Sequence, residues 1–261
     1  SNISFQEMNS SAYSAKKQVI IILSKDVYDK LKIDNGEPKK ALCSAVANLT
    51  LAKQLIFGVI NFKKSDKDVY KYELEAMKRA YIENYYNAMD SLIQLLDDDN
   101  VIPGWTDTKY KKMISTLQIK TTEDFDGLYP IDLSYLFFFR SIPLQKEALE
   151  EVFTSYFDRA KDKQEAMLIL KRCLAKQTVS IALRRFDIIE FPATIRNLFD
   201  DSTAGRTGKD EQTRMLEISA GLSDEVQRTL RDLDLLLTDS GGSVETETSF
   251  NRADDKIYLL G

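Results

Sequence analysis

The chain has 261 residues, of which 43% are hydrophobic and 30% are charged, so it can bury a core as one large domain or two smaller ones. Its formal net charge of -5 argues against a general nucleic-acid binder, which needs a dense surface of lysine and arginine. The absence of histidine excludes Ser-His-Asp and Cys-His nucleophile systems and His-ligated metal sites.

The sequence carries no recognisable signal for export or membrane insertion. Its longest apolar run, residues 19–23, is far shorter than the roughly 18 residues that span a bilayer. No basic segment followed by an apolar one opens the chain, so we expect no signal peptide and a cytosolic product. The two cysteines, Cys43 and Cys173, favour a reducing compartment over a disulfide scaffold.

The first part of the chain predicts three helices. Residues 11–32 predict one continuous helix, because their apolar side chains recur at helical spacing. That stripe consists of Ala15, Val19, Ile22, Leu23, Val27 and Leu31. After a turn at 34–38, residues 39–62 are apolar on nearly every face, which predicts a helix buried centrally. Residues 68–97 predict a long amphipathic helix that VIPGW, at 101–105, interrupts.

The second part also predicts helices, from the same apolar spacing. With 5 prolines and 10 glycines, the chain has few residues that break long helices. The predicted elements are irregular chain at 121–134, helices at 142–157 and 164–186, a polar loop at 202–212 and a last helix to about Leu237. We therefore predict an all-α protein that ends in an extended C-terminal arm.

Two stretches of the sequence echo each other. Residues 43–62, CSAVANLTLAKQLIFGVINF, align with residues 172–191, RCLAKQTVSIALRRFDIIEF. The helices before and after each stretch also correspond in order, although any two amphipathic helices share some likeness. Because repeats decide architecture, we predict two similar helical-bundle units in tandem. The predicted divisions are a first unit at 1–105, a connector at 106–120, a second unit at 121–238 and the arm at 239–261.

Two short motifs resemble ligand-binding loops but lack essential residues. TAGRTGKDE, at 203–211, has Thr203 where a phosphate-binding loop needs its first glycine, and no strand precedes it. The run Asp97–Asp99 lacks the spaced ligands and central glycine of a calcium loop. We expect a surface loop in the first case and a solvated helix end in the second.

A magnesium-dependent enzyme would need acidic residues that converge on one helix face. The candidates are Glu73, Glu75, Glu83 and Asp90. At 3.6 residues per turn these four do not share one stripe. We therefore predict no catalytic, cofactor-binding or metal-binding residues.

Two further groups of residues have a structural and an interface interpretation. YLFFFR, at 135–140, is a core plug or an interface anchor, and the core is favoured. Basic residues flank the second Ala-rich helix and the loop after it, where they face DNA or form ion pairs with a partner. These residues are Lys171, Arg172, Arg184, Arg185, Arg206 and Lys209.

The arm is the segment most suited to binding a partner. Residues 239–256 are polar enough to stay unstructured alone, whereas the final KIYLLG is largely apolar. The predicted partner-binding residues are Phe250, Ile257, Tyr258, Leu259 and Leu260. Such a segment adds a strand to a neighbour's sheet or enters its groove, unless it docks on its own domain.

The order of these features resembles a known family. An Ala-rich helix that ends in VINF (59–62) or IIEF (188–191), a long polar-faced helix and an arm that ends in NRADDKIYLL (251–260) occur in this order. The chain in this respect is similar to head–tail connector or head-completion ring proteins of Bacteroidetes phages and prophages, including crAss-like phages. The resemblance covers most of the chain and consists of apolar patterns.

The resemblance implies a structural virion protein without catalysis or cofactors. It implies a homo-oligomeric ring of about twelve subunits that docks beneath the portal protein and contacts other connector or tail proteins. Neighbours are tied by their arms, and DNA passes through the lumen without sequence-specific binding. The expected location is the head–tail interface of the virion, away from membranes, after synthesis in the bacterial cytoplasm. A duplicated unit departs from single-unit connectors, which leaves open which half faces the portal.

Two other classes of function stay open at this point. The first is a non-viral helical adaptor or regulatory protein that docks through its C-terminal tail. The second is the carboxylate-dependent enzyme described above. Loss of assembly after removal of the arm distinguishes the connector from both.

Overall fold

The computed structural model describes residues 5–64, 71–99, 102–198 and 208–238. Within these ranges all regular structure is helical and no strand occurs, so the predicted all-α class is confirmed. The helices of the first half are α1 (Phe5–Leu23), α2 (Lys25–Ile33), α3 (Glu37–Lys64), α4 (Lys71–Asp99) and α5 (Lys109–Ile114). Those of the second half are α6 (Thr122–Leu128), α7 (Tyr135–Ala148), the π-helical turn η1 (Leu149–Phe153), α8 (Thr154–Arg159), α9 (Gln164–Arg185), the 3-10 turn η2 (Ile188–Glu190), α10 (Ala193–Arg196) and α11 (Gly208–Thr238).

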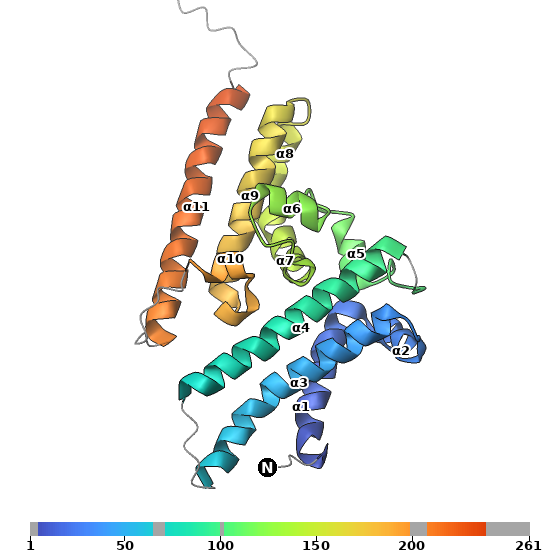
Figure 1. Ribbon diagram of the computed structural model, residues 1–261. Coiled ribbons are helices and arrows are strands. Elements are labelled where there is room, and N and C mark those ends of the chain that lie inside the picture. The colour runs from blue at the N-terminus through green and yellow to red at the C-terminus, as the bar shows by residue number, and fades with distance from the viewer. Residues whose placement is uncertain (1–4, 65–70, 100–101, 199–207, 239–261) are drawn as a thin grey trace, which may run out of the picture.

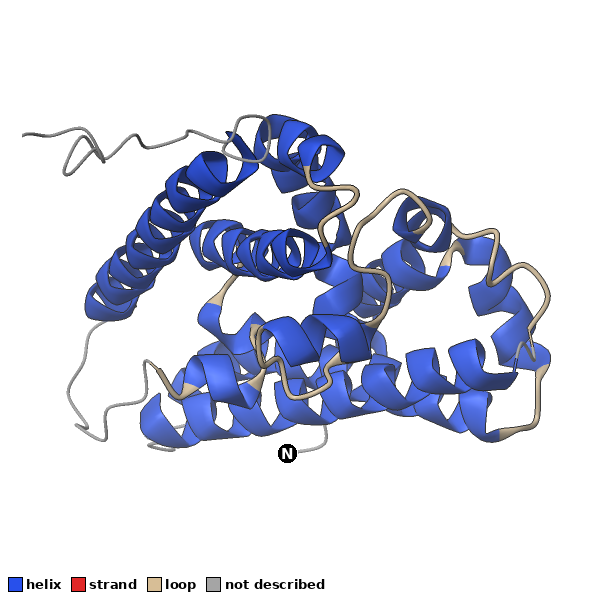
Figure 2. Ribbon diagram, turned by 90° about the horizontal axis from the view of Figure 1, so that it is seen from above, coloured by secondary structure: helices blue, strands red, loops and turns tan. Residues whose placement is uncertain are grey.

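The helices form two groups that share one continuous core. In Figure 1 the blue and blue-green helices α1 to α4 occupy the lower part, and α8, α9 and α11 occupy the upper part. Helices α6 and α7 lie between the two groups, and α7 contacts both α4 and α9. Figure 2 shows the helices from above, joined by loops. A single buried cluster of hydrophobic residues runs through both groups.

The prediction of one helix over 11–32 is wrong at a single residue. Ser24 has a φ of 72°, which interrupts the helical backbone between α1 and α2. Its hydroxyl accepts a hydrogen bond from the backbone N–H of Val27 at 3.4 Å, so the residue caps the start of α2. The predicted apolar stripe is nevertheless buried on both sides of the break, as the apolar spacing indicates.

The second predicted helix forms, but it is not buried on every face. On α3 the buried hydrophobic residues make one stripe: Leu42, Ala45, Leu49 and Ala52. Cys43, Ser44 and Ala47 are exposed, which corrects the expectation of a centrally buried helix. The reason is tertiary, because the main described contacts of α3 are with α1, α2 and α4, which leave one of its faces exposed.

The turn that leads into the predicted connector packs into the core. The turn after α4 needs Gly104, which has a φ of 92° and a backbone so close to Asp26 that a Cβ would lie 2.9 Å from its Oδ2. Trp105 follows and is fully buried. Its ring stacks on that of Phe139 of α7, with 5.4 Å between the ring centroids. Its indole N–H donates to Asp97 at 2.6 Å, so the end of α4 is fixed to this turn.

Residues 121–140 are more regular than the sequence indicates. The predicted irregular chain at 121–134 contains α6, whose first turn is capped by the hydroxyl of Thr121. Helix α7 begins at Tyr135, well before the predicted start at 142, because Ser134 caps it and accepts from the N–H of Phe137 at 3.2 Å. The side chains of 136–139 are almost wholly buried, so the core interpretation of YLFFFR is confirmed.

Helix α9 is the central element of the second half, and its predicted range is confirmed. Residues 178–183 are buried without interruption, which places every face of that part of the helix inside the protein. It contacts α6, α7, α8 and α11. Between α9 and α11, Ser180 and Ser219 each donate a hydroxyl hydrogen bond to the other's carbonyl, at 2.8 and 2.9 Å. Small hydroxyl residues thus allow close approach of two long helices while satisfying their own polar atoms.

The last predicted loop ends earlier than expected. Helix α11 begins at Gly208, so the part of the predicted loop at 208–212 is helical. Residues 203–207, which hold most of the TAGRTGKDE motif, lie outside the described residues, as does the whole arm at 239–261.

The two halves share an order of contacts. The Ala-rich helix of each half, α3 or α9, contacts an earlier helix of the same half, α1 or α7, and a long later helix, α4 or α11. Consecutive antiparallel helices of unrelated origin pack in the same order. The tandem repeat and its boundaries at 105 and 121 therefore stay predictions.

Candidate functional site

The predicted partner-binding residues are not placed by the structure. Phe250 and the segment Ile257–Leu260 lie outside the described residues, and the described chain ends with α11 at Thr238. The candidate sites that the structure does describe are two neighbouring cavities where the halves meet, and a groove at the end of α11.

The larger cavity at the junction is a cleft of about 460 Å³. It lies between α1, α3 and α4 on one side and α7 with residues 186–190 on the other. Its walls are mostly apolar, and the charged and phenolic side chains in its lining are Lys53, Lys78, Tyr85, Tyr86, Tyr110, Arg140 and Glu190. A mostly apolar cleft with a few convergent polar groups is the usual form of a binding site.

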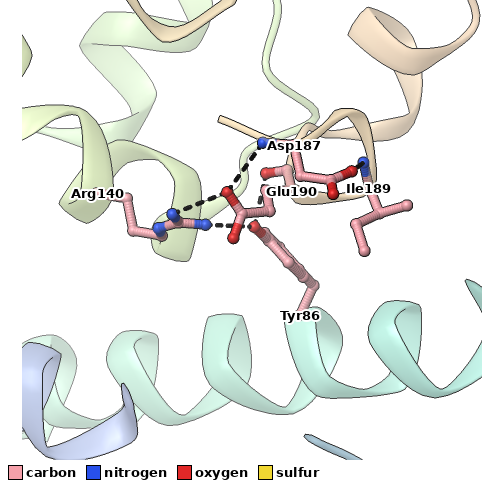
Figure 3. A network of polar contacts seen from close by, with 5 residues as sticks. All are labelled: Tyr86, Arg140, Asp187, Ile189 and Glu190. Atoms are coloured by element: carbon pink, nitrogen blue, oxygen red, sulfur yellow. Dashed lines mark hydrogen bonds and ion pairs between the residues drawn. The ribbon is translucent and has the colours of Figure 1, made fainter. Parts of the chain in front are cut away.

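A polar network joins the two halves across this cleft (Figure 3). Arg140 of α7 donates to the carboxylate of Glu190 at 3.0 Å and to the hydroxyl of Tyr86 at 3.1 Å. Tyr86, on α4, in turn donates to the backbone carbonyl of Glu190 at 2.6 Å. Three segments far apart in the chain are thereby fixed to one another.

The turn that presents Glu190 is itself held by hydrogen bonds. Asp187 and Glu190 form a capping box around η2, in which the N–H of Asp187 donates to the Glu190 carboxylate at 3.2 Å and the Asp187 carboxylate accepts from Ile189 at 3.2 Å. Phe186 supplies a further contact, because the centre of its ring lies 4.4 Å from the guanidinium carbon of Arg140. The acceptors of Arg140 are thus pre-positioned.

Burial sets the protonation of this network. Desolvation raises the pKa of Tyr85 to about 12 and raises that of Tyr86 further, although the positive charge of Arg140 opposes both shifts. Desolvation alone would lower the pKa of Arg140. The contacts of its guanidinium with Tyr86 and Glu190 have a larger opposite effect, so the pKa of Arg140 is raised. At neutral pH the tyrosines are neutral and the arginine is charged, so the network is an ion pair with a phenol donor and contains no activated nucleophile.

The second cavity, of about 330 Å³, adjoins the first and shares Tyr86 with it. Asp90 of α4 lies in its wall and accepts hydrogen bonds at the start of α7, from the N–H of Leu136 at 2.7 Å and the hydroxyl of Ser134 at 3.3 Å. Burial raises the pKa of Asp90 to about 6, against the opposing effect of these donors. This carboxylate therefore caps α7 and ties it to α4.

A strained loop borders the second cavity. Asp132 and Leu133 both have positive φ angles, 56° and 51°, which non-glycine residues rarely adopt. Asp126 holds this conformation by accepting from the N–H groups of Ile131 and Leu133 at 2.8 and 3.0 Å. The carboxylate of Asp132 accepts a hydrogen bond from the N–H of Thr194 at 2.8 Å. This backbone conformation therefore accompanies a contact between the loop and the start of α10.

The acidic residues weighed for magnesium chemistry do not converge. Glu73 is exposed, Glu83 pairs with Arg196 at 3.0 Å, and Asp90 caps α7, while the side chain of Glu75 is not described. Within the described part of the chain, no group of three or more acidic or cysteine side chains is close enough to hold a metal ion.

The acidic run at the end of α4 makes contacts within the chain. In the acidic run at 97–99, Asp97 binds Trp105 and also pairs with Lys111 at 2.6 Å. This contact corrects the expectation of a solvated helix end at its first residue.

The basic residues flanking α9 are partly used within the chain. Arg185 binds both carboxylate oxygens of Glu147 at 2.6 and 2.7 Å. Arg172 and Arg184 are exposed, and Lys171 is half-buried. Arg206 and the side chain of Lys209 lie outside the described part. The ion pair of Arg185 is made with its own chain, and the choice between DNA and a partner stays open for the exposed residues.

Sequence reasoning missed the junction network. In the sequence, IIEF marks the end of a helix, but no local pattern gives Glu190 a partner. The available signal was a single acid between apolar residues at 188–191 and a single arginine after the aromatic run at 135–139. Each is a charge next to an apolar stretch, and such charges usually have a partner when they are buried.

Comparison with known proteins adds no family to this description. No protein-family model, curated protein or solved structure matches the chain. None of the helices that the structure describes combines the length and apolarity needed to cross a membrane.

Proposed function

We propose that the protein is a structural, ring-forming connector of a phage virion that docks beneath the portal and surrounds the DNA passage. The observation that carries the proposal is the presence of exposed apolar side chains on both halves. In the first half these are Tyr13, Ile21, Ile33 and Met77, and in the second half Leu133, Leu168, Leu198 and Leu216. A closed ring of identical subunits joins two different surfaces of each copy, so it needs such residues on both.

The junction between the halves supports the same proposal. Arg140, Tyr86 and Glu190 use their polar groups on one another, and Asp90 uses its carboxylate to cap α7. These contacts hold the halves in one orientation, which a subunit needs if its two faces are to close a ring of fixed symmetry. The net charge of -5 also suits a DNA conduit, because a strongly basic lumen would retain the DNA.

Native mass spectrometry of the full-length chain over a concentration series tests the proposal. The expected result is a closed oligomer of many copies. Removal of residues 239–261 is expected to leave the circular dichroism of the subunit unchanged and to abolish assembly. A chain that stays monomeric at all concentrations, or that assembles equally well without the arm, contradicts the proposal.

A pair of surface substitutions tests whether the ring uses two faces. Ile33→Asp and Leu216→Asp place a charge on the first and second half, at side chains that are 81% and 49% exposed. Each variant alone should fail to close a ring, whereas a mixture should form a discrete heterodimer through the one intact pair of faces. Asn35→Asp adds the same charge beside Ile33 and serves as the control that still assembles.

The alternative function, a helical adaptor that docks through its tail, predicts a different result. It predicts that no species larger than a dimer forms at any concentration, and that neither surface substitution changes this outcome. The arm would then capture another protein and leave the self-assembly of this chain unaffected.

A further inference from the structure

A third cavity, separate from the junction, lies where the described chain ends. It is a groove of about 520 Å³ between the first turns of α9 and the last turns of α11. Its apolar lining consists of Ala166, Ile169, Leu233, Leu236 and Leu237, with Lys163 among the polar residues of its rim. In Figure 1 this is the upper end of the red helix α11, beside the start of α9.

The groove is held in shape by contacts between its walls. Asp234 of α11 accepts from Arg159 at 2.6 Å and from the hydroxyl of Tyr156 at 2.9 Å, both on α8. Lys163, just before α9, donates to the backbone carbonyl of Leu236 at 3.4 Å, near the end of α11 where a cation is favoured. The last turns of α11 are therefore fixed to the second half, which makes the groove a preformed site.

The lining remains open to solvent in the described chain. The side chain of Leu236 is 64% exposed although it faces a groove with four other apolar residues. Leu235, next to it, is 68% exposed but does not line the groove. Covering the groove would remove apolar surface from water, at about 25 cal/mol for each Å² buried.

The sequence that follows α11 contains one segment suited to this groove. From Thr238 the chain continues through residues 239–256, which are mostly polar and include the pair Gly241 and Gly242. Only at Ile257–Leu260 do four apolar residues stand together. At about 3.3 Å per residue, the polar part can span up to about 60 Å, enough to return to its own groove or to reach that of a neighbour.

We propose that the groove between α9 and α11 binds the C-terminal segment Ile257–Leu260. Apolar side chains of the segment fill the groove. Charges of both signs lie on the rim, at Lys163 and Glu165, and just before the segment, at Asp255 and Lys256, so the apolar contacts carry the pairing. In the proposed ring the segment comes from the neighbouring copy. That part rests on the proposed function, whereas the pairing of segment and groove does not.

A photo-crosslinking experiment on the full-length chain tests both parts separately. Tyr258 is replaced by p-benzoylphenylalanine, ¹⁴N- and ¹⁵N-labelled chains are mixed, and the crosslinked peptides are identified by mass spectrometry after irradiation. Crosslinks are expected in the peptides that contain Ile169 or Leu236. Leu236→Asp should lower their yield by at least about tenfold, as expected for a central contact residue. Leu235→Asp adds the same charge in the same turn, outside the groove, and should leave the yield unchanged.

The outcomes distinguish the groove from the ring. Groove crosslinks that join ¹⁴N and ¹⁵N chains support both the docking site and the proposed assembly. Groove crosslinks within one chain support the docking site and contradict arm exchange between copies. Crosslinks elsewhere, no crosslinks, or equal losses in Leu235→Asp and Leu236→Asp overturn the assignment of the groove. Circular dichroism of both variants ensures that the comparison is between folded proteins.

Discussion

Helices α3 and α9 have similar Ala-rich sequences but different surroundings. The described part of α3 buries one stripe of apolar residues and exposes Cys43 and Ala47. In α9, residues 178–183 are buried on all faces, because α6, α7, α8 and α11 cover it. The comparison shows that a composition rich in alanine and leucine permits central burial, and that the number of neighbouring helices decides whether it occurs.

The largest expected effect is a difference in unfolding free energy between two variants, one with a new carboxylate on α9 and one with a new carboxylate on α3. Ala175 of α9 is fully buried, and Ala175→Asp puts a carboxylate where no partner is available, at an expected cost of about 4 kcal/mol or more. Ala47→Asp on the exposed face of α3 should cost less than about 1 kcal/mol, mainly through helix propensity. Urea unfolding followed by circular dichroism measures both. Similar costs would mean that the two helices are equally buried.

The next effect concerns the junction that fixes the two halves. Arg140→Met leaves Glu190 without its ion-pair partner and Tyr86 without a donor, at an expected cost of about 2 kcal/mol. The cost is below that of a fully buried pair, because the two charged side chains are 26% and 30% exposed. Adding Glu190→Gln to the variant should recover part of the loss. A double variant as unstable as the sum of the singles would show that the pair is not coupled.

A smaller effect should appear in the pH dependence of stability, through Asp90. Its pKa in the folded protein is raised from 3.8 to about 6, so the folded state binds more protons than the unfolded state between these values. The contribution of Asp90 to stability is therefore fully present below about pH 4 and is lost as the pH rises through 6. Asp90→Asn keeps an acceptor for Leu136 and removes this loss. The stability of the variant relative to wild type should therefore be higher at pH 7.5 than at pH 4.5, by about 2 kcal/mol.

Urea unfolding of wild type and variant at the two pH values measures this effect. Asp98→Asn, an exposed acid on the same helix, provides the control and should not change the pH dependence. An unchanged pH dependence in Asp90→Asn would show that the cap of α7 is solvated.

The smallest effect is a difference in the chemical reactivity of the two cysteine thiols. Cys43 is exposed on α3, whereas Cys173 is buried on α9, where desolvation raises the pKa of its thiol. In the native protein a thiol reagent should modify Cys43 quickly and Cys173 only as fast as the protein unfolds. Cys43→Ser should remove the fast phase and Cys173→Ser the slow one. Two fast phases would contradict the burial of α9.

The sequence predicted the class of fold and most of the long helices. Apolar spacing identified the buried stripe from Ala15 to Leu31, and the aromatic run at 136–139 was correctly assigned to the core. The helix break at Ser24 was missed, because one residue with a positive φ changes the backbone without changing the periodicity. The early start of α7 was missed for a related reason, since the cap at Ser134 is completed by Asp90 from another helix.

The candidate sites were predicted less completely than the helices. The arm residues Phe250 and Ile257–Leu260 were selected from their apolar character alone, and their role stays a prediction. The groove proposed to bind them combines α9 with α11, and the network of Arg140 combines α4, α7 and η2. Their residues are separated by tens of positions in the chain, so no local pattern relates them.

By itself, then, the sequence determined where helices form and which of their faces are apolar, because both depend on residues three or four positions apart. The tertiary structure alone decided that α9 is enclosed while α3 is half open, and that Arg140 meets Glu190 and Tyr86. These outcomes depend on which helices lie side by side. That arrangement is set by the packing of the whole core, to which every apolar face contributes at once.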